Sequence, residues 1–118
     1  MADSGLTGPF SLTEDSIAKN VTKTSPGAYV LGKTKENTFY ISYVGRSDDD
    51  VADRIRDHIG EYDQFKYGYY PSAKSAFEKE CRLYHDFGGS DKLDNKVHPA
   101  RPKNTSYPCP VSGCRELL

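Results

Sequence analysis

No stretch of this sequence approaches the roughly 20 consecutive apolar residues that a membrane-spanning helix needs. The first residues, Met1 to Gly5, carry neither the basic segment nor the apolar stretch of a secretory signal peptide. Cysteine is scarce and odd in number, at three, which fits a reducing compartment better than a disulfide framework. We therefore expect a cytoplasmic protein without a membrane segment.

An excess of positive charge is also missing. The formal net charge is −1 at pH 7, so the overall charge gives no support to nucleic-acid binding, although a local positive patch can still steer DNA. Tryptophan is absent and there is one methionine, whereas there are nine tyrosines, several of which recur in the motifs below.

The length of 118 residues fits one domain with short flanking segments. Residues 1–25 are expected to form an N-terminal extension with a short helix, because Ser11 and Glu14 have the spacing of a capping box. Residues 26–95 are expected to form the domain itself. Residues 96–118 are rich in proline and contain a cysteine pair, and they are expected to run extended over the surface or as a flexible tail.

Residues 26–45 predict a β-hairpin. The segment from Phe39 to Val44 is rich in aromatic and β-branched residues, which favour strands, and a polar turn precedes it. Tyr29 follows Gly27 by two positions, and Tyr43 precedes Gly45 by two. Glycine permits a sharp turn or a close approach at those points. The two phenols are either ordinary core side chains or neighbours in a site.

A helix is predicted from about Val51 to Gly60, with Asp49 or Asp50 as its N-cap. Arg54 and His58 are four residues apart on this helix, so their side chains are neighbours. The tyrosine-rich stretch that follows, residues 61–71, suits either a third strand or a packed loop.

A second helix is predicted from about Ala73 to Phe87, capped by Ser72 and stopped by two glycines. Glu80 lies in the middle of its apolar face, where a carboxylate is costly unless it is paired, hydrogen-bonded or bound to a cation. Glu78 lies instead between Lys74 and Arg82 on a solvated face. Glu80 is thus a candidate metal ligand, or it pairs with a core arginine or reaches water.

Cys109 and Cys114 resemble half of a zinc knuckle, because a tight turn can bring two thiolates together. A tetrahedral site needs four ligands, and His98 and Cys81 are the further candidates considered. The alternatives are a structural zinc site and two free thiols.

Four short motifs follow one another along residues 26–95. They are Gly27-Ala28-Tyr29, Tyr43-Val44-Gly45, Arg54-x-x-x-His58, and Ala76-Phe77-x-x-Glu80-x-x-Leu83-Tyr84. This ordered set resembles the GIY-YIG nuclease domain. The resemblance implies a small α/β (α+β) fold, with a three-stranded antiparallel sheet flanked by helices. It also implies a metal-dependent endonuclease that hydrolyses DNA phosphodiester bonds, on branched or damaged DNA, in repair or restriction.

Carried over by position, the resemblance assigns roles to five residues. Tyr29 and Tyr43 look like the two catalytic tyrosines, and Tyr29 would orient or deprotonate the attacking water. Arg54 would bind the scissile phosphate, and His58 would complete the hydrogen-bond network as a proton acceptor. Glu80 would hold one Mg²⁺ or Mn²⁺ ion.

Lys33, Lys35 and Arg46 lie near the predicted strand ends and are candidate contacts to the DNA backbone. Asn95 resembles an asparagine that closes the family's domain. Two alternatives to the active nuclease stay open. One is a catalytically inactive module of the same fold that binds nucleic acid or protein, and the other is a structural domain whose zinc-linked tail makes protein contacts.

Overall fold

A four-stranded antiparallel sheet forms the centre of the protein in the computed structural model, which describes residues 4–111 and 114. The prediction of an α+β fold is confirmed, but the sheet has one strand more than the three expected. The strands, in the spatial order β1-β4-β2-β3, are β1 (Thr7–Ser11), β4 (Gln64–Tyr69), β2 (Gly27–Lys35) and β3 (Thr38–Ser47).

The additional strand comes from the N-terminal segment. Phe10 and Ser11 pair with Phe65 and Gln64 of β4, so the chain stays extended through Ser11. The predicted cap at Ser11 is therefore wrong. Helix α1 (Glu14–Asn20) begins after Thr13, whose side chain accepts a hydrogen bond from the Ser16 amide. The tyrosine-rich stretch, which sequence left open, supplies strand β4.

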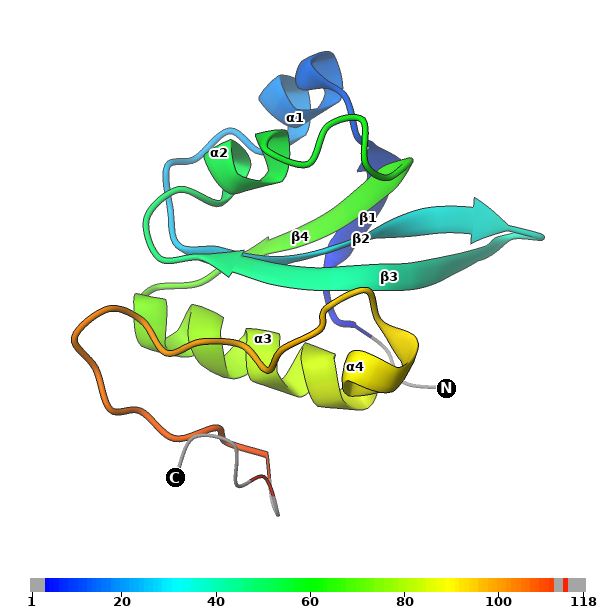
Figure 1. Cartoon of the computed structure of the whole chain (residues 1–118). Helices are drawn as coiled ribbons and strands as arrows, with labels where there is room; N and C mark the ends of the chain where they lie inside the picture. Colours follow the sequence, from blue (N-terminus) through cyan, green and yellow to red (C-terminus); the bar gives the residue numbers. More distant parts are fainter. Residues whose placement is uncertain (1–3, 112–113, 115–118) are drawn as a thin grey trace.

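Strand β2 is buried between two neighbours, and its side chains alternate between two cores. Tyr29 and Leu31 pack on the face covered by α1 and α2 (Val51–Arg56). Figure 1 shows these two helices on one side of the sheet. Ala28 and Val30 pack on the opposite face, covered by α3 (Ala73–Asp86) and the short α4 (Gly89–Lys92). Both faces of the sheet are thus covered by helices.

Local signals account for the helix boundaries. The Asp50 side chain accepts from the Ala52 amide at the start of α2, and Ser72 forms a capping box with Ser75 at the start of α3. Helix α2 ends at Arg56, earlier than predicted, so the prediction that His58 lies on the same helix as Arg54 is wrong, and Ile59 beyond it is exposed. Helix α3 ends at Asp86, and Gly88 follows in the left-handed conformation.

Strand β3 is an edge strand, and the chain after α4 protects part of it. The Asn95 side chain accepts from the Val44 amide at 2.9 Å and donates to the Val44 carbonyl at 2.8 Å. Asn95 therefore supplies one backbone-like pair of hydrogen bonds to an edge that would otherwise be open. From there the chain runs back along α3 (Figure 1). Among the described residues, no helix has the length and apolar character to span a membrane.

Candidate active site

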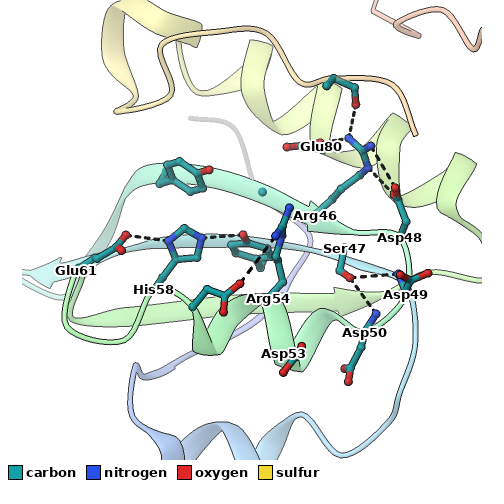
Figure 2. A pocket seen from close by; sticks show the side chains of 15 residues that line it. Arg46, Ser47, Asp48, Asp49, Asp50, Asp53, Arg54, His58, Glu61 and Glu80 are labelled. Atoms are coloured by element: carbon teal, nitrogen blue, oxygen red, sulfur yellow. Dashed lines mark hydrogen bonds and ion pairs between the residues drawn. The ribbon is translucent and has the colours of Figure 1, made fainter. Parts of the chain in front are cut away.

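A cavity of about 790 Å³ opens where β2, β3, α2 and α3 meet, and Figure 2 shows its lining. It lies at the end of the hairpin where β2 begins and β3 ends. All five residues to which sequence gives a catalytic role line this cavity, although they come from four elements and the turn that follows α2: Tyr29, Tyr43, Arg54, His58 and Glu80.

The Tyr29 ring lies directly over the backbone of Gly45, its partner across the β2–β3 ladder. A Cβ atom at position 45 would lie 2.4 Å from Cζ and 2.5 Å from Oη of Tyr29. Only glycine fits there without displacing a ring that is 2% exposed. This contact explains why a glycine follows the tyrosine of β3, and it fixes the Tyr29 hydroxyl at the cavity wall.

Tyr29, His58 and Glu61 form a hydrogen-bonded chain. The Tyr29 hydroxyl lies 3.0 Å from Nε2 of His58, and Nδ1 of the same ring lies 2.9 Å from Oε1 of Glu61. A carboxylate only accepts, so Nδ1 carries the proton, and in the neutral ring Nε2 accepts from Tyr29. The Tyr43 ring packs against the same imidazole, with 5.0 Å between ring centroids. The histidine is thus held by both tyrosines.

Burial raises the pKa of Tyr29, and the neighbouring Tyr43 raises it further, whereas Arg54 lowers it by less. The pKa of Tyr43 is also raised, first by burial and then by the charge of Glu80. Both side chains are therefore neutral phenols at physiological pH. Tyr29 can act on a water molecule only while passing its own proton to a partner, and His58 is placed to receive it.

Glu80 is 8% exposed on α3, and its Oε1 lies 2.7 Å from Nη1 of Arg46. Arg46 is also bonded to Asp48 through Nε at 2.7 Å, and Nη1 donates to the Ala100 carbonyl at 2.5 Å. Burial raises the pKa of Glu80 to about 7 despite the lowering by Arg46. The expectation that Glu80 needs a partner is met by a core arginine, one of the alternatives left open by sequence.

Arg54 differs from Arg46 in being exposed and only weakly paired. Its side chain is 60% exposed, and the nearest carboxylate, Asp57, lies 3.9 Å away. An exposed pair at that distance contributes little. Arg54 therefore presents a guanidinium to the cavity that can turn toward an anionic group.

Carboxylates dominate the remaining lining of the cavity. Five aspartates and two glutamates line it, against Arg46, Arg54 and His58: Asp48, Asp49, Asp50, Asp53, Asp57, Glu61 and Glu80. Such a wall repels a phosphate unless cations offset it. Glu80 is the buried member of this set and the residue to which sequence assigns Mg²⁺ or Mn²⁺; a cation there would share the carboxylate with Arg46.

The three basic residues predicted to contact DNA lie in two different places. Lys33 and Lys35 are exposed toward the tip of the β2–β3 hairpin, about 13 and 20 Å along the strand from Tyr29, and they do not line the cavity. Arg46 does line the cavity, but its guanidinium is bonded to Asp48, Glu80 and Ala100.

A second group of chemistry-bearing side chains lies apart from the cavity, between α3 and the C-terminal segment. One ligand atom from each of His85, His98, Cys109 and Cys114 lies within 4.8 Å of the others, so the cluster could hold a metal ion. The structure therefore brings together the three predicted zinc ligands and adds His85. Cys81 is outside this set; burial and a hydrogen bond with Cys109 raise the pKa of its thiol.

Sequence reasoning missed Glu61, Asp48 and His85. Glu61 follows His58 by three residues, a spacing that predicts contact on a turn, and it could have been found. Asp48 follows Arg46 by two residues, and the two bond at the point where strand β3 ends, which the sequence does not place. His85 is one of three histidines in the chain, and pairing it with His98 requires knowing the path of the C-terminal segment.

Comparisons of this chain with protein-family models, with curated proteins and with solved structures gave no match.

Proposed function

We propose that the protein is a metal-dependent endonuclease that hydrolyses DNA phosphodiester bonds, of the GIY-YIG type. One observation carries the proposal: Tyr29, Tyr43, Arg54, His58 and Glu80 line one cavity. Hydrolysis of a phosphodiester needs an activated water, positive charge near the phosphate, and a place for the proton. The five side chains can serve each of these needs within one space.

Arg54 is the proposed phosphate ligand. Its exposed and weakly paired guanidinium can form a two-pronged hydrogen bond with the scissile phosphate and offset the charge that develops on it. Arg46 has a different role in this proposal, because its bonds to Asp48 and Ala100 hold it against Glu80. Lys33 and Lys35 remain proposed contacts to DNA that follows the hairpin beyond the cavity.

Tyr29 and His58 are the proposed proton carriers. A water molecule gives one proton to the Tyr29 oxygen while the phenolic proton moves to Nε2 of His58. The resulting hydroxide bonds to phosphorus as the P–O bond to the leaving sugar oxygen breaks, and that oxygen takes a proton from solvent. Glu61, bonded to Nδ1, stabilises the imidazolium that forms. The raised pKa of Tyr29 supports this coupled transfer over a free phenolate base.

Glu80 is the residue that would hold Mg²⁺ or Mn²⁺. A bound divalent ion supplies positive charge to the phosphate and the leaving oxygen. Arg46 would then position the Glu80 carboxylate, because its guanidinium bonds Glu80 and is itself held by Asp48.

One contact favours the alternative, a module of this fold that binds nucleic acid or protein without cutting. The Arg46 guanidinium already neutralises Glu80, so the carboxylate has a partner without any metal. In that case the cavity would bind its target but leave the phosphodiester bond intact.

A supercoiled-plasmid nicking assay with the full chain separates the two. We expect nicking with Mg²⁺ or Mn²⁺ and none after chelation of the divalent ion. Glu80→Gln should lower the nicking rate by at least roughly 100-fold. Glu78→Gln is the matched control on the same helix, because Glu78 lies outside the cavity, and it should nick at the wild-type rate.

Branched and nicked duplexes tested beside the plasmid would identify the preferred substrate. A wild-type protein that shifts DNA in a gel but never cuts it would select the binding module. Equal rates for wild type and Glu80→Gln would remove Glu80 from the mechanism.

A further inference from the structure

We propose that His85, His98, Cys109 and Cys114 bind one structural Zn²⁺ ion that fastens the C-terminal segment to helix α3. This inference does not depend on the proposed nuclease activity, because the cluster shares no residue with the cavity.

The spacing of the ligand atoms is that of a tetrahedral zinc site. Nε2 of His85 lies 3.2 Å from Nε2 of His98 and 3.5 Å from Sγ of Cys109, and Nε2 of His98 lies 3.4 Å from Sγ of Cys114. Around a tetrahedral Zn²⁺, with Zn–N of about 2.05 Å and Zn–S of about 2.3 Å, two nitrogens lie about 3.4 Å apart and a nitrogen and a sulfur about 3.6 Å apart. The observed separations match these within a few tenths of an ångström.

The orientation of His98 is also that of a metal ligand. Its Nδ1 lies 2.9 Å from the Pro99 carbonyl, which can only accept, so Nδ1 carries the proton. In the neutral ring the lone pair of Nε2 then points at His85 and Cys114. A ligating histidine commonly fixes its tautomer through a backbone carbonyl in this way.

The donor set selects the metal. Two thiolates and two imidazoles suit zinc, whereas Mg²⁺ prefers oxygen ligands. Because all four protein ligands fill a tetrahedral shell, the site is closed and structural rather than catalytic. The two cysteines are brought together by a turn in which the Cys114 amide donates to the Val111 carbonyl at 3.1 Å.

The C-terminal segment needs such an anchor. Among the described residues, those of 96–111 form no helix or strand, and the two prolines Pro99 and Pro102 are their only buried residues. Short metal-bound segments gain much of their folding free energy from the ion itself. Zinc would therefore supply stability that so few buried side chains do not.

The anchored segment contacts the cavity. Ala100 lies between His98 and Cys109, and its carbonyl accepts from Arg46, which in turn holds Glu80. Zinc binding would therefore keep Ala100 on Arg46, so the zinc site would also position the carboxylate of the cavity.

The test is metal analysis of the full chain, purified under reducing conditions without chelator. We expect about one zinc ion per chain. Replacing Zn²⁺ with Co²⁺ should give the visible absorption of a tetrahedral centre together with thiolate charge transfer. Absence of zinc combined with failure to take up Co²⁺, or a Cys109–Cys114 disulfide in the purified protein, would overturn the proposal.

Variants separate ligation from packing. His85→Ala and Cys109→Ser should lose the metal, whereas His85→Cys should retain it, because a third thiolate is an equally good ligand. Arg82→Ala is the matched control on the same helix, three residues before His85; Arg82 is exposed and outside the cluster, so this variant should keep the full zinc content. Loss of zinc in the control, or full zinc content in both His85→Ala and Cys109→Ser, would contradict the assigned ligands.

Hydrogen exchange tests the anchoring. Removing zinc from the wild-type chain should speed amide exchange across residues 96–111 while leaving β1 and β4 protected. Unchanged exchange in residues 96–111 after complete removal of zinc would show that the ion does not hold this segment.

Discussion

At the scale of single residues, the cavity depends on the contact between Arg46 and Glu80. The carboxylate is buried on α3, and the guanidinium reaches it from the end of β3 while bonding Asp48 and the Ala100 carbonyl. Burial disfavours the charged form of Glu80 and the arginine favours it. The effect of burial is the larger, so the pKa is raised. A carboxylate with this balance changes its protonation state near neutral pH.

The pKa of Glu80 predicts how stability changes with pH. Because the folded-state pKa is about 7 and the ordinary value is 4.5, the folded protein holds a proton that the unfolded chain has released between these values. The contribution of Glu80 is therefore fully present below pH 4.5 and is lost as pH rises to 7. Its slope is up to about 1.4 kcal/mol per pH unit.

Urea unfolding of wild type and Glu80→Gln from pH 4.5 to 8, without added Mg²⁺ or Mn²⁺, measures this contribution. The difference in unfolding free energy should fall as pH rises, in the sense that wild type loses stability relative to the variant. A difference that is constant over this range, or that grows with pH, would show that burial does not raise the Glu80 pKa.

The Tyr29 hydroxyl has a chemical role in this account beyond packing. Tyr29→Phe removes its hydrogen bond to His58, at a stability cost of about 0.5–1.5 kcal/mol. We expect the nicking rate to fall by about 10²–10⁴-fold, because proton transfer through the phenol is lost. Tyr40→Phe, at an exposed position on β3, is the matched control and should keep the wild-type rate. Full activity in Tyr29→Phe would show that Tyr29 has only a packing role and that its hydroxyl takes no part in the reaction.

At the scale of elements, the β2–β3 hairpin determines where the cavity lies. The register sets Tyr29 opposite Gly45, and the absence of a side chain at position 45 lets the ring lie against the neighbouring strand. The turn that follows α2 then adds His58, and helix α3 adds Glu80; the two helices cover opposite faces of the sheet. The close approach of these two strands thus places Tyr29 beside groups that come from two helices and the turn after α2.

Gly45→Ala tests this close approach. Because a Cβ atom at that position would lie 2.4 Å from Cζ of the buried Tyr29, the ring or the strand must move. We expect a loss of about 1–3 kcal/mol in unfolding free energy, together with reduced nicking, since Tyr29 leaves His58. Gly68→Ala in β4 is the comparison, because its nearest neighbour is the tip of the Leu6 side chain at 3.0 Å. Equal effects of the two substitutions on both readouts would contradict the special role of position 45.

At the scale of the whole molecule, the chain builds a sheet covered on both faces and brings two separate groups of reactive side chains to α3, one that includes Glu80 and one that includes His85. Sequence predicted the hairpin and both main helices, because strand-favouring residues, Asp50 and Ser72 are local signals. It also predicted the burial of Glu80, because residues three and four positions away on a helix share its face.

The remaining features depend on contacts distant in sequence. Strand β1 contains Gly8 and Pro9, which are poor strand residues, so it is set by pairing with β4 rather than by local preference. The partner of Glu80 lies 34 residues away, and nothing local selects Arg46 over Arg54. The fourth ligand of the metal cluster, His85, follows from the path of the C-terminal segment along α3.

The most direct test of the account is whether Glu80 and Tyr29 act as one site, measured by single-turnover nicking in Mg²⁺ of wild type, Tyr29→Phe, Glu80→Gln and the double variant. Residues that act as a unit have strongly non-additive effects. We predict that the double variant cuts at about the rate of Glu80→Gln alone. Independent effects, in which Tyr29→Phe lowers the rate by the same factor with or without Glu80, or a wild-type protein that fails to nick, would contradict it.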